Sequence, residues 1–121
     1  DLFLDTHPYN AGTTASDALK MGLPMLTMIG QSYQARMGAS ILTSINLPEL
    51  ITNSPEEYEA LAIELATNPE KLKAIKEKLA SNLTSAPLYN TKLFTKNLES
   101  AYTTMYQRHQ KGLEPDHIYV D

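Results

Sequence analysis

The chain has 121 residues, of which 42% are hydrophobic and 20% charged, with a formal net charge of −4 and no cysteine. This composition is typical of a globular domain, and it excludes a disulfide framework, a thiolate metal site and a fibrous protein. No apolar run approaches the ~20 residues that a membrane-spanning helix needs, and no cluster of Lys or Arg would attract nucleic acid or an anionic membrane. We therefore expect a cytoplasmic protein without nucleic-acid or membrane partners.

The first half of the chain predicts a βαβ unit. Residues 2–4 form a short apolar run that is typical of a buried parallel strand. Residues 15–21 fit two helical turns that close on Gly22, and residues 24–28 form a second apolar strand. Because native chains seldom begin inside a core strand, we expect this chain to be a fragment of a longer protein.

Helices dominate the second half. A helix is expected over residues 34–45, with Met37, Ile41 and Leu42 as its inward-facing candidates, and a brief strand over residues 50–52. The whole chain then forms one α/β domain or part of one. We expect a βαβ part at residues 1–52 and a helical part at residues 53–121.

Three helix starts and one helix end are visible in the sequence. Ser54 and Glu57 match the N-cap and third helical positions of a capping pattern, and Asn68 caps the next helix. A last helix should cover residues 91–110 and end before Gly112. A stripe on this last helix is expected to pack in the core: Tyr102, Met105 and Tyr106.

The segment that could carry chemistry runs from Asp5 to Asp17, between the first strand and the first helix. A helix N-terminus that follows a parallel strand offers free N–H groups and a partial positive charge to a phosphate. Gly12 lets the backbone approach a ligand, and Thr13 and Thr14 add hydroxyl donors. Asp17, one turn later, could accept hydrogen bonds from ribose hydroxyls.

A structural role for the same residues is a real alternative. Thr14 and Asp17 also fit a capping box, in which both side chains serve only to start the helix. The spacing is neither that of a P-loop nor that of the dinucleotide-binding glycine pattern. From local chemistry alone, phosphate binding and helix capping both remain open.

Other candidates point to structure. His7, His109 and His117 lie far apart and lack metal-ligand spacing, so we expect no metal site. Glu56 and Glu57 are interpreted as helix N-terminal charge rather than as paired catalytic carboxylates.

Three segments in the same order resemble the C-terminal catalytic region of O-linked N-acetylglucosaminyltransferases, especially bacterial members fused to tetratricopeptide repeats. The first covers residues 4–27 and contains Asn-Ala-Gly-Thr-Thr-Ala-Ser-Asp at residues 10–17. The second covers residues 30–40. The third covers residues 85–99, with the tail at residues 112–118. Together they span nearly the whole chain.

The resemblance implies the later part of the second Rossmann-like lobe of a GT-B glycosyltransferase, followed by C-terminal helices. The implied reaction is an inverting, metal-independent transfer of N-acetylglucosamine from UDP-GlcNAc to Ser or Thr of a protein, without a cofactor. Gly12, Thr13 and Thr14 would then bind the donor diphosphate, and Asp17 the ribose. No catalytic residue is expected in this fragment, which alone should be inactive.

The sequence also departs from this family. Animal members have a His where this chain has Gly12, and the family's Lys contacts to the phosphates fall outside the chain. Plant relatives with a similar loop transfer fucose from a GDP donor, so O-fucosyl transfer stays open. A nucleotide-sugar epimerase of the same architecture and a non-catalytic interaction module are further alternatives.

The expected partners follow from this interpretation. They are a nucleotide sugar, a protein acceptor, and the rest of the catalytic region with its N-terminal repeats. Strand edges and apolar helix faces left uncovered in the fragment predict self-association.

Overall fold

A computed structural model describes residues 1–120 of the chain. The chain separates into two compact units, the first comprising Asp1–Leu88 and the second beginning at Tyr89. Helices that the sequence assigned to a separate C-terminal part, residues 53–88, thus pack within the first unit. The functional division at residues 52 and 53 stays a prediction.

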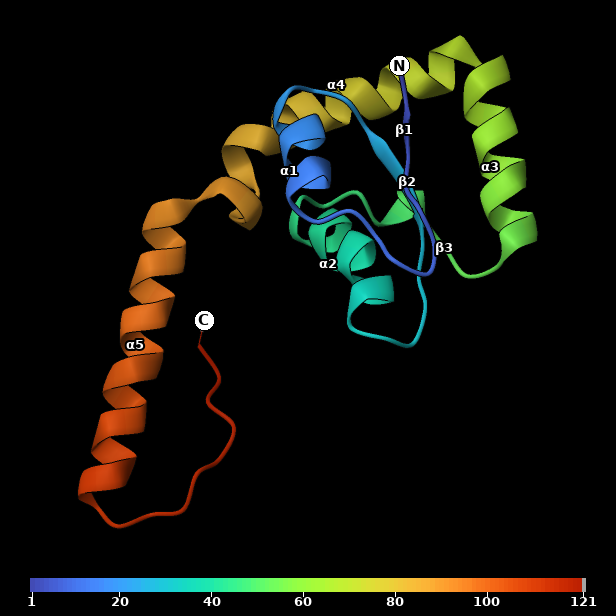
Figure 1. Cartoon of the computed structure of the whole chain (residues 1–121). Helices are drawn as coiled ribbons and strands as arrows, with labels where there is room; N and C mark the ends of the chain where they lie inside the picture. Colours follow the sequence, from blue (N-terminus) through green and yellow to red (C-terminus); the bar gives the residue numbers. More distant parts are fainter. Residues whose placement is uncertain (121) are drawn as a thin grey trace. The chain divides into compact units, whose positions relative to one another are not determined.

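Three short parallel strands organise the first unit (Figure 1). Strand β2 (Met25–Met28) lies between β1 (Phe3–Leu4) and β3 (Ile51–Thr52). Phe3 is opposite Met25, and Thr27 is opposite Ile51. The predicted strands and their parallel pairing are therefore confirmed.

The prediction that the first strand is buried is wrong. Leu4 is 54% exposed, and Phe3 is only half-buried. The physical reason is position, since β1 is the edge of this sheet whereas β2 is central and supplies the buried residues Met25, Leu26 and Thr27.

Helix α1 (Thr13–Lys20) connects β1 to β2, which confirms the βαβ unit. It begins two residues before the predicted start and buries Ala15 and Leu19. At its end Gly22 has a φ of +79°, a conformation that glycine adopts without strain. The N–H of Leu23 donates to the carbonyl of Ala18 at 2.9 Å, which closes the helix as the sequence predicted.

Helix α2 (Met37–Ser44) follows a 3-10 helix (Gln34–Arg36). In Figure 1, α1 and α2 lie on one side of the strands and α3 on the other. The inward face of α2 agrees only in part with the prediction. Leu42 is buried as predicted, and so are Gly38 and Ala39, whereas Met37 and Ile41 are half-buried.

Helices α3 (Pro55–Thr67) and α4 (Pro69–Ser85) begin at the predicted caps. The Ser54 hydroxyl accepts from the N–H of Glu57 at 3.2 Å, and the Asn68 side chain accepts from Lys71 N–H at 3.1 Å. Their inward faces hold Leu65 on α3 and both Ile75 and Leu79 on α4.

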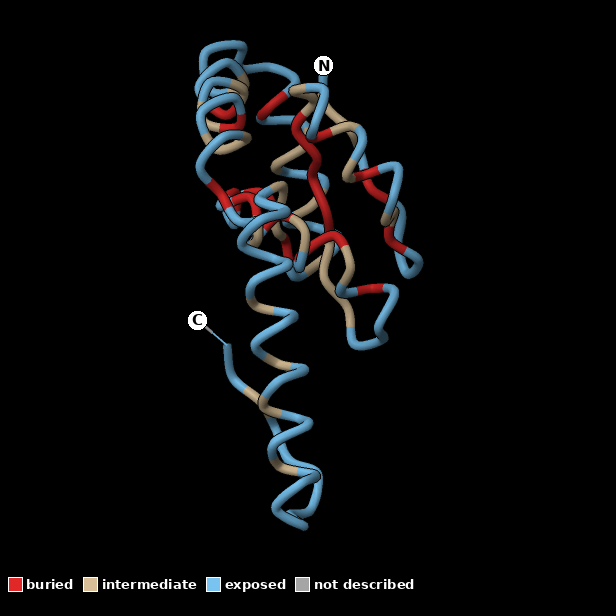
Figure 2. Tube along the Cα trace, turned by 90° about the vertical axis from the view of Figure 1, so that its left-hand side faces the viewer, coloured by how far each residue is buried: buried red, intermediate tan, exposed pale blue. Residues whose placement is uncertain are grey.

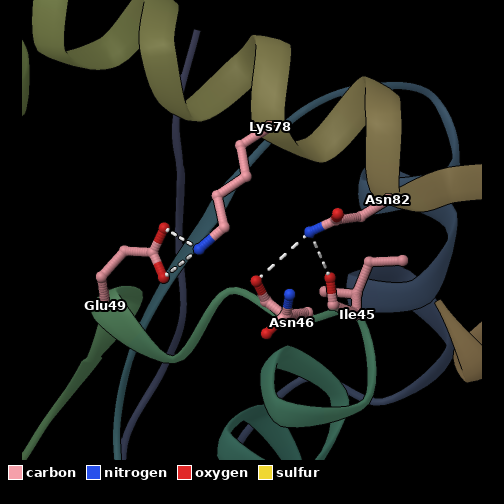
Figure 3. A network of polar contacts seen from close by, with 5 residues as sticks. All are labelled: Ile45, Asn46, Glu49, Lys78 and Asn82. Carbon is pink, nitrogen blue, oxygen red and sulfur yellow. Dashed lines mark hydrogen bonds and ion pairs between the residues drawn. The ribbon is translucent and has the colours of Figure 1, made fainter. Parts of the chain in front are cut away.

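Helix α4 is also attached to the C-terminal end of α2 by polar contacts (Figure 3). The Asn82 amide donates to the carbonyl oxygens of Ile45 at 2.9 Å and Asn46 at 3.2 Å. Lys78 Nζ lies 2.7 Å from Glu49 Oε1. Asn46 has a φ of 60°, which ends α2. These contacts fix the segment between α2 and β3.

The second unit contains α5 (Thr91–Gln110), whose bounds match the prediction. The Asn90 side chain caps its start by accepting from Leu93 N–H at 3.0 Å, and Gly112, with a φ of +65°, follows its end. No residue of α5 is buried (Figure 2). The prediction of core packing is therefore wrong for three residues: Tyr102, Met105 and Tyr106 are 54–65% exposed.

Among residues 1–120, none of the helices combines the length and the apolar character that crossing a bilayer requires.

Candidate functional site

The N-terminus of α1 lacks a side-chain cap. Its N-cap residue is Gly12, which has no side chain that could accept a hydrogen bond from the first turn. The N–H of Ser16 donates to the Gly12 carbonyl at 3.0 Å. Thr14 lies inside the helix rather than at the N-cap, so the capping box of Thr14 and Asp17, the structural alternative to ligand binding, does not form. Within residues 1–120, the N–H groups of Thr13 and Thr14 have no hydrogen-bond partner.

The predicted ligand-binding side chains share the solvent-facing side of α1. Thr13, Thr14 and Asp17 are all exposed, whereas Ala15 between them is fully buried. Asp17 follows Thr13 by four residues and Thr14 by three, so it lies beside both on the helix surface. The helix N-terminus thus presents two hydroxyls, free N–H groups and, one turn later, a carboxylate.

Basic charge is scarce around this site. Before residue 71, Lys20 and Arg36 are the only Lys or Arg residues of the chain. Lys20 lies in the last turn of α1, far along the helix from its N-terminus. An anion at the N-terminus of α1 therefore depends mainly on backbone N–H groups and on the helix dipole, which places roughly half a positive charge there.

Arg36 lines a hollow of about 350 Å³ together with Tyr33, Met37 and Ser40. The hollow borders the α1 N-terminus, because a Cβ placed on Gly12 would lie 3.8 Å from Met37 Cγ. Among the described residues, the structure records no ion pair for the Arg36 guanidinium. The hollow therefore offers an available cation beside Gly12.

A buried carboxylate supports the loop before α1. Asp5 is 7% exposed. Its Oδ1 accepts from the N–H groups of Thr6 at 2.9 Å and Ala11 at 2.8 Å, and its Oδ2 accepts from the Thr27 hydroxyl at 2.6 Å. Since Ala11 directly precedes Gly12, this carboxylate fixes where the helix begins.

Asn10 provides a second attachment for the same loop, and it is 2% exposed. Its Nδ2 donates to the Thr6 carbonyl at 2.8 Å, and its Oδ1 accepts from Gly38 N–H at 3.2 Å. The loop is thereby joined both to itself and to α2.

Two ionisable groups have perturbed pKa values. Burial, with a smaller contribution from the negative charge of Asp5, raises the pKa of Tyr58 above its ordinary value of 10.0. The Tyr58 hydroxyl donates to the Asp5 carbonyl at 2.9 Å. Hydrogen bonds to its own backbone N–H and to Ser54 lower the pKa of Glu56, which agrees with its interpretation as helix N-terminal charge.

The histidines belong to different units of the chain. A Cβ on Gly30 would come within 2.9 Å of His7 Cε1, which places His7 against the end of β2. His109 and His117 belong to the second unit. Among residues 1–120, no three side chains of the metal-binding types come together.

Sequence reasoning found Gly12, Thr13 and Thr14 but assigned no role to Asp5, Asn10, Thr27 or Arg36. The sequence did contain one signal for the buried pair of Asp5 and Thr27. Thr27 is the single polar residue of a strand with the sequence Met-Leu-Thr-Met, and Asp5 directly follows an apolar strand. A polar residue that is buried in a strand normally has a hydrogen-bond partner.

A parallel βαβ unit with an uncapped helix N-terminus is an arrangement that many phosphate- and nucleotide-binding proteins share. Comparison with known proteins narrows the class, because residues 1–98 match the family model of glycosyl transferase family 41. The chain belongs to this family of glycosyltransferases.

Individual relatives of the chain agree with this family assignment. An Arabidopsis thaliana protein described as a probable UDP-N-acetylglucosamine–peptide N-acetylglucosaminyltransferase, SEC, is 37% identical over 121 residues, which cover 99% of this chain and 12% of the relative. A Hordeum vulgare protein with the same description, SPINDLY, is 36% identical over 115 residues, covering 95% of this chain and 12% of the relative. The chain thus spans only a small part of these relatives.

The fold is similar to that of a solved enzyme as well. A mutant of the Thermobaculum terrenum O-GlcNAc transferase superposes with a TM-score of 0.78 and 36% identity, covering 85% of this chain and 20% of the other. This match confirms the predicted fold class, an α/β portion of a GT-B glycosyltransferase.

Proposed function

We propose that this chain forms the donor-diphosphate side of a longer, inverting and metal-independent glycosyltransferase. That enzyme would transfer N-acetylglucosamine from UDP-GlcNAc to Ser or Thr of acceptor proteins. The observation that carries the proposal is the uncapped N-terminus of α1, where Thr13 and Thr14 are exposed and their N–H groups have no hydrogen-bond partner among residues 1–120. The names of the relatives, which are UDP-N-acetylglucosamine–peptide transferases, support the choice of donor and acceptor.

In this proposal the site acts on the leaving group. When the bond from the sugar to the diphosphate breaks, negative charge grows on the diphosphate oxygens. N–H and O–H donors from Gly12, Thr13 and Thr14 stabilise that charge more strongly in the transition state than in the bound donor, so they increase the rate. Asp17 would accept hydrogen bonds from the ribose hydroxyls.

The rest of the enzyme supplies what this chain lacks. The catalytic base, the acceptor groove and the groups that bind the base of the nucleotide are assigned to other parts of the longer protein. We also propose that this protein carries N-terminal tetratricopeptide repeats, is of the bacterial type and works in the cytoplasm. The isolated chain is expected to be inactive and to bind UDP weakly.

The test uses the intact transferase that contains this chain, labelled UDP-GlcNAc and a mixture of protein acceptors. Each hydrogen bond to a charged oxygen contributes about 1.5–3 kcal/mol, so Thr13→Ala with Thr14→Ala should lower kcat/KM at least about 100-fold. Thr67→Ala with Thr103→Ala is the matched control, because both are exposed threonines on helices other than α1. It should leave kcat/KM unchanged.

Two outcomes would contradict the proposal. Incorporation of sugar that survives the Thr13 and Thr14 substitutions would remove the site assignment. Incorporation from GDP-fucose but not from UDP-GlcNAc would replace the donor while leaving the diphosphate site in place.

A further inference from the structure

The hydrogen bonds of Asp5 close the loop that carries the proposed diphosphate site. One carboxylate oxygen accepts from Thr6 at the start of the loop and from Ala11 at its end, at 2.9 and 2.8 Å. A single atom therefore holds both ends of residues 6–11. The carboxylate is buried and both its oxygens are occupied, so Asp5 is unsuited to touching substrate itself.

The other oxygen of Asp5 is attached to the central strand. The Thr27 hydroxyl donates to Asp5 Oδ2 at 2.6 Å, across 22 residues of sequence. Thr27 is fully buried, and its own carbonyl accepts from the Thr52 hydroxyl at 2.9 Å. Because β2 lies between two other strands, Thr27 gives the loop a fixed reference point.

The loop orientation decides which N–H groups are available. Ala11 N–H is used internally by Asp5, whereas the N–H groups of Thr13 and Thr14 have no hydrogen-bond partner within residues 1–120. If the Asp5 carboxylate moved, Ala11 would move with it. Gly12 and the first turn of α1 follow directly in the chain.

We propose that Asp5 and Thr27 are positioning residues for the donor diphosphate. Their hydrogen bond holds the start of α1 so that the free N–H groups and the threonine hydroxyls converge on one anionic group. The inference rests on the proposed function, since it assigns to this pair the alignment of the same site.

A matched pair of variants tests the inference in the intact transferase. Thr27→Val removes the hydroxyl that Asp5 accepts from, whereas Thr52→Val removes a hydroxyl of the same kind from the neighbouring strand. Both residues are buried, so both variants should melt at a lower temperature. Only Thr27→Val should weaken UDP binding measured by calorimetry and raise the KM for the donor, each by about tenfold. The KM for the acceptor protein should stay the same.

Two more variants separate positioning from general stability. Thr27→Ser keeps the hydroxyl and should restore UDP affinity to within about twofold of wild type even if the melting temperature stays low. Thr27→Ala replaces the valine variant if that fails to fold, because it removes the hydroxyl without pressing a methyl group against the Asp5 carboxylate.

The possible results distinguish a failure of the positioning role from a failure of the proposed function. Equal effects of Thr27→Val and Thr52→Val on UDP affinity, or no rescue by Thr27→Ser, would overturn the inference. If wild type does not bind UDP, or if the Thr13 and Thr14 substitutions leave binding unchanged, the proposed function itself fails. If the Thr13 and Thr14 substitutions weaken UDP binding as expected but Thr27→Val binds UDP like wild type, only the positioning role of Asp5 and Thr27 is rejected.

Discussion

Substituting Gly38 by Ala is a direct test of how tightly the polar core beneath the site is packed. Gly38 is buried on α2, and its N–H donates to Asn10. A Cβ at this position would lie 2.6 Å from Asp5 Oδ2 and 2.9 Å from Thr27 Cβ, and closer still to the Thr27 hydroxyl oxygen. The added methyl would therefore occupy the space of the hydrogen bond between Asp5 and Thr27.

The size of the effect follows from these distances. Overpacking a buried site costs about 1–3 kcal/mol. Since the neighbours are a buried carboxylate and a residue on the central strand, neither can move aside as the end of a flexible side chain could. For a unit of the size of Asp1–Leu88, which contains Gly38, a loss of about 2 kcal/mol lowers the melting temperature by about 8–16 °C.

The assay is thermal unfolding of the 121-residue chain, followed by far-UV circular dichroism. Gly12→Ala is the control, because its Cβ would meet only Met37 Cγ at 3.8 Å, an ordinary contact distance. That change should cost less than about 1 kcal/mol, as expected for alanine at an N-cap. A Gly38→Ala chain that melts within 2 °C of wild type, which corresponds to a loss of well under about 1 kcal/mol, would refute the packing argument.

Two further predictions concern charge. Arg36→Ala should weaken UDP binding to the intact transferase about two- to fivefold at low salt, the range of an exposed charge pair, and this loss should shrink at high salt. Lys20→Ala is the control, because it removes the same charge at the other end of α1 and should have no effect. Equal losses of affinity in the two variants would contradict a role for Arg36 in binding the diphosphate. Tyr58→Phe should cost about 1 kcal/mol in urea unfolding at pH 8, because the hydroxyl donates to Asp5. The raised pKa of Tyr58 makes this contribution complete below pH 10, the ordinary pKa, and lost as the pH rises through the folded-state pKa. If wild type were more stable than Tyr58→Phe by the same amount at pH 8 and at a pH above the folded-state pKa of Tyr58, this assignment would be wrong.

Helix starts could be predicted from the sequence because their causes are local. Ser54 and Asn68 each accept a hydrogen bond from an N–H three residues later, so the cap and its partner are close together in the chain. The same holds for Gly22, whose left-handed conformation depends on its missing side chain.

Burial was harder to predict because it depends on what lies opposite an apolar residue. Leu4 belongs to an apolar run but lies on an edge strand, and Tyr102 belongs to a helical stripe but lies on a helix without buried residues. Periodicity identifies the face of an element that is apolar. It does not say whether another element covers that face.

The candidate site combines both kinds of information. Local sequence identified Gly12, Thr13 and Thr14 as a loop that enters a helix, but it left both capping and ligand binding open. The structure decided against the capping box, because α1 begins at Thr13 and leaves Thr14 within its first turn.

The sequence alone thus determined the type and order of the elements and the place of the candidate site, since these depend on residues a few positions apart. The tertiary structure alone decided that Asp5, Thr27 and Gly38 meet beneath that site. Their hydrogen bond and contacts join positions from 11 to 33 residues apart in the chain, and they exist only after the strands have paired and α2 has packed against them.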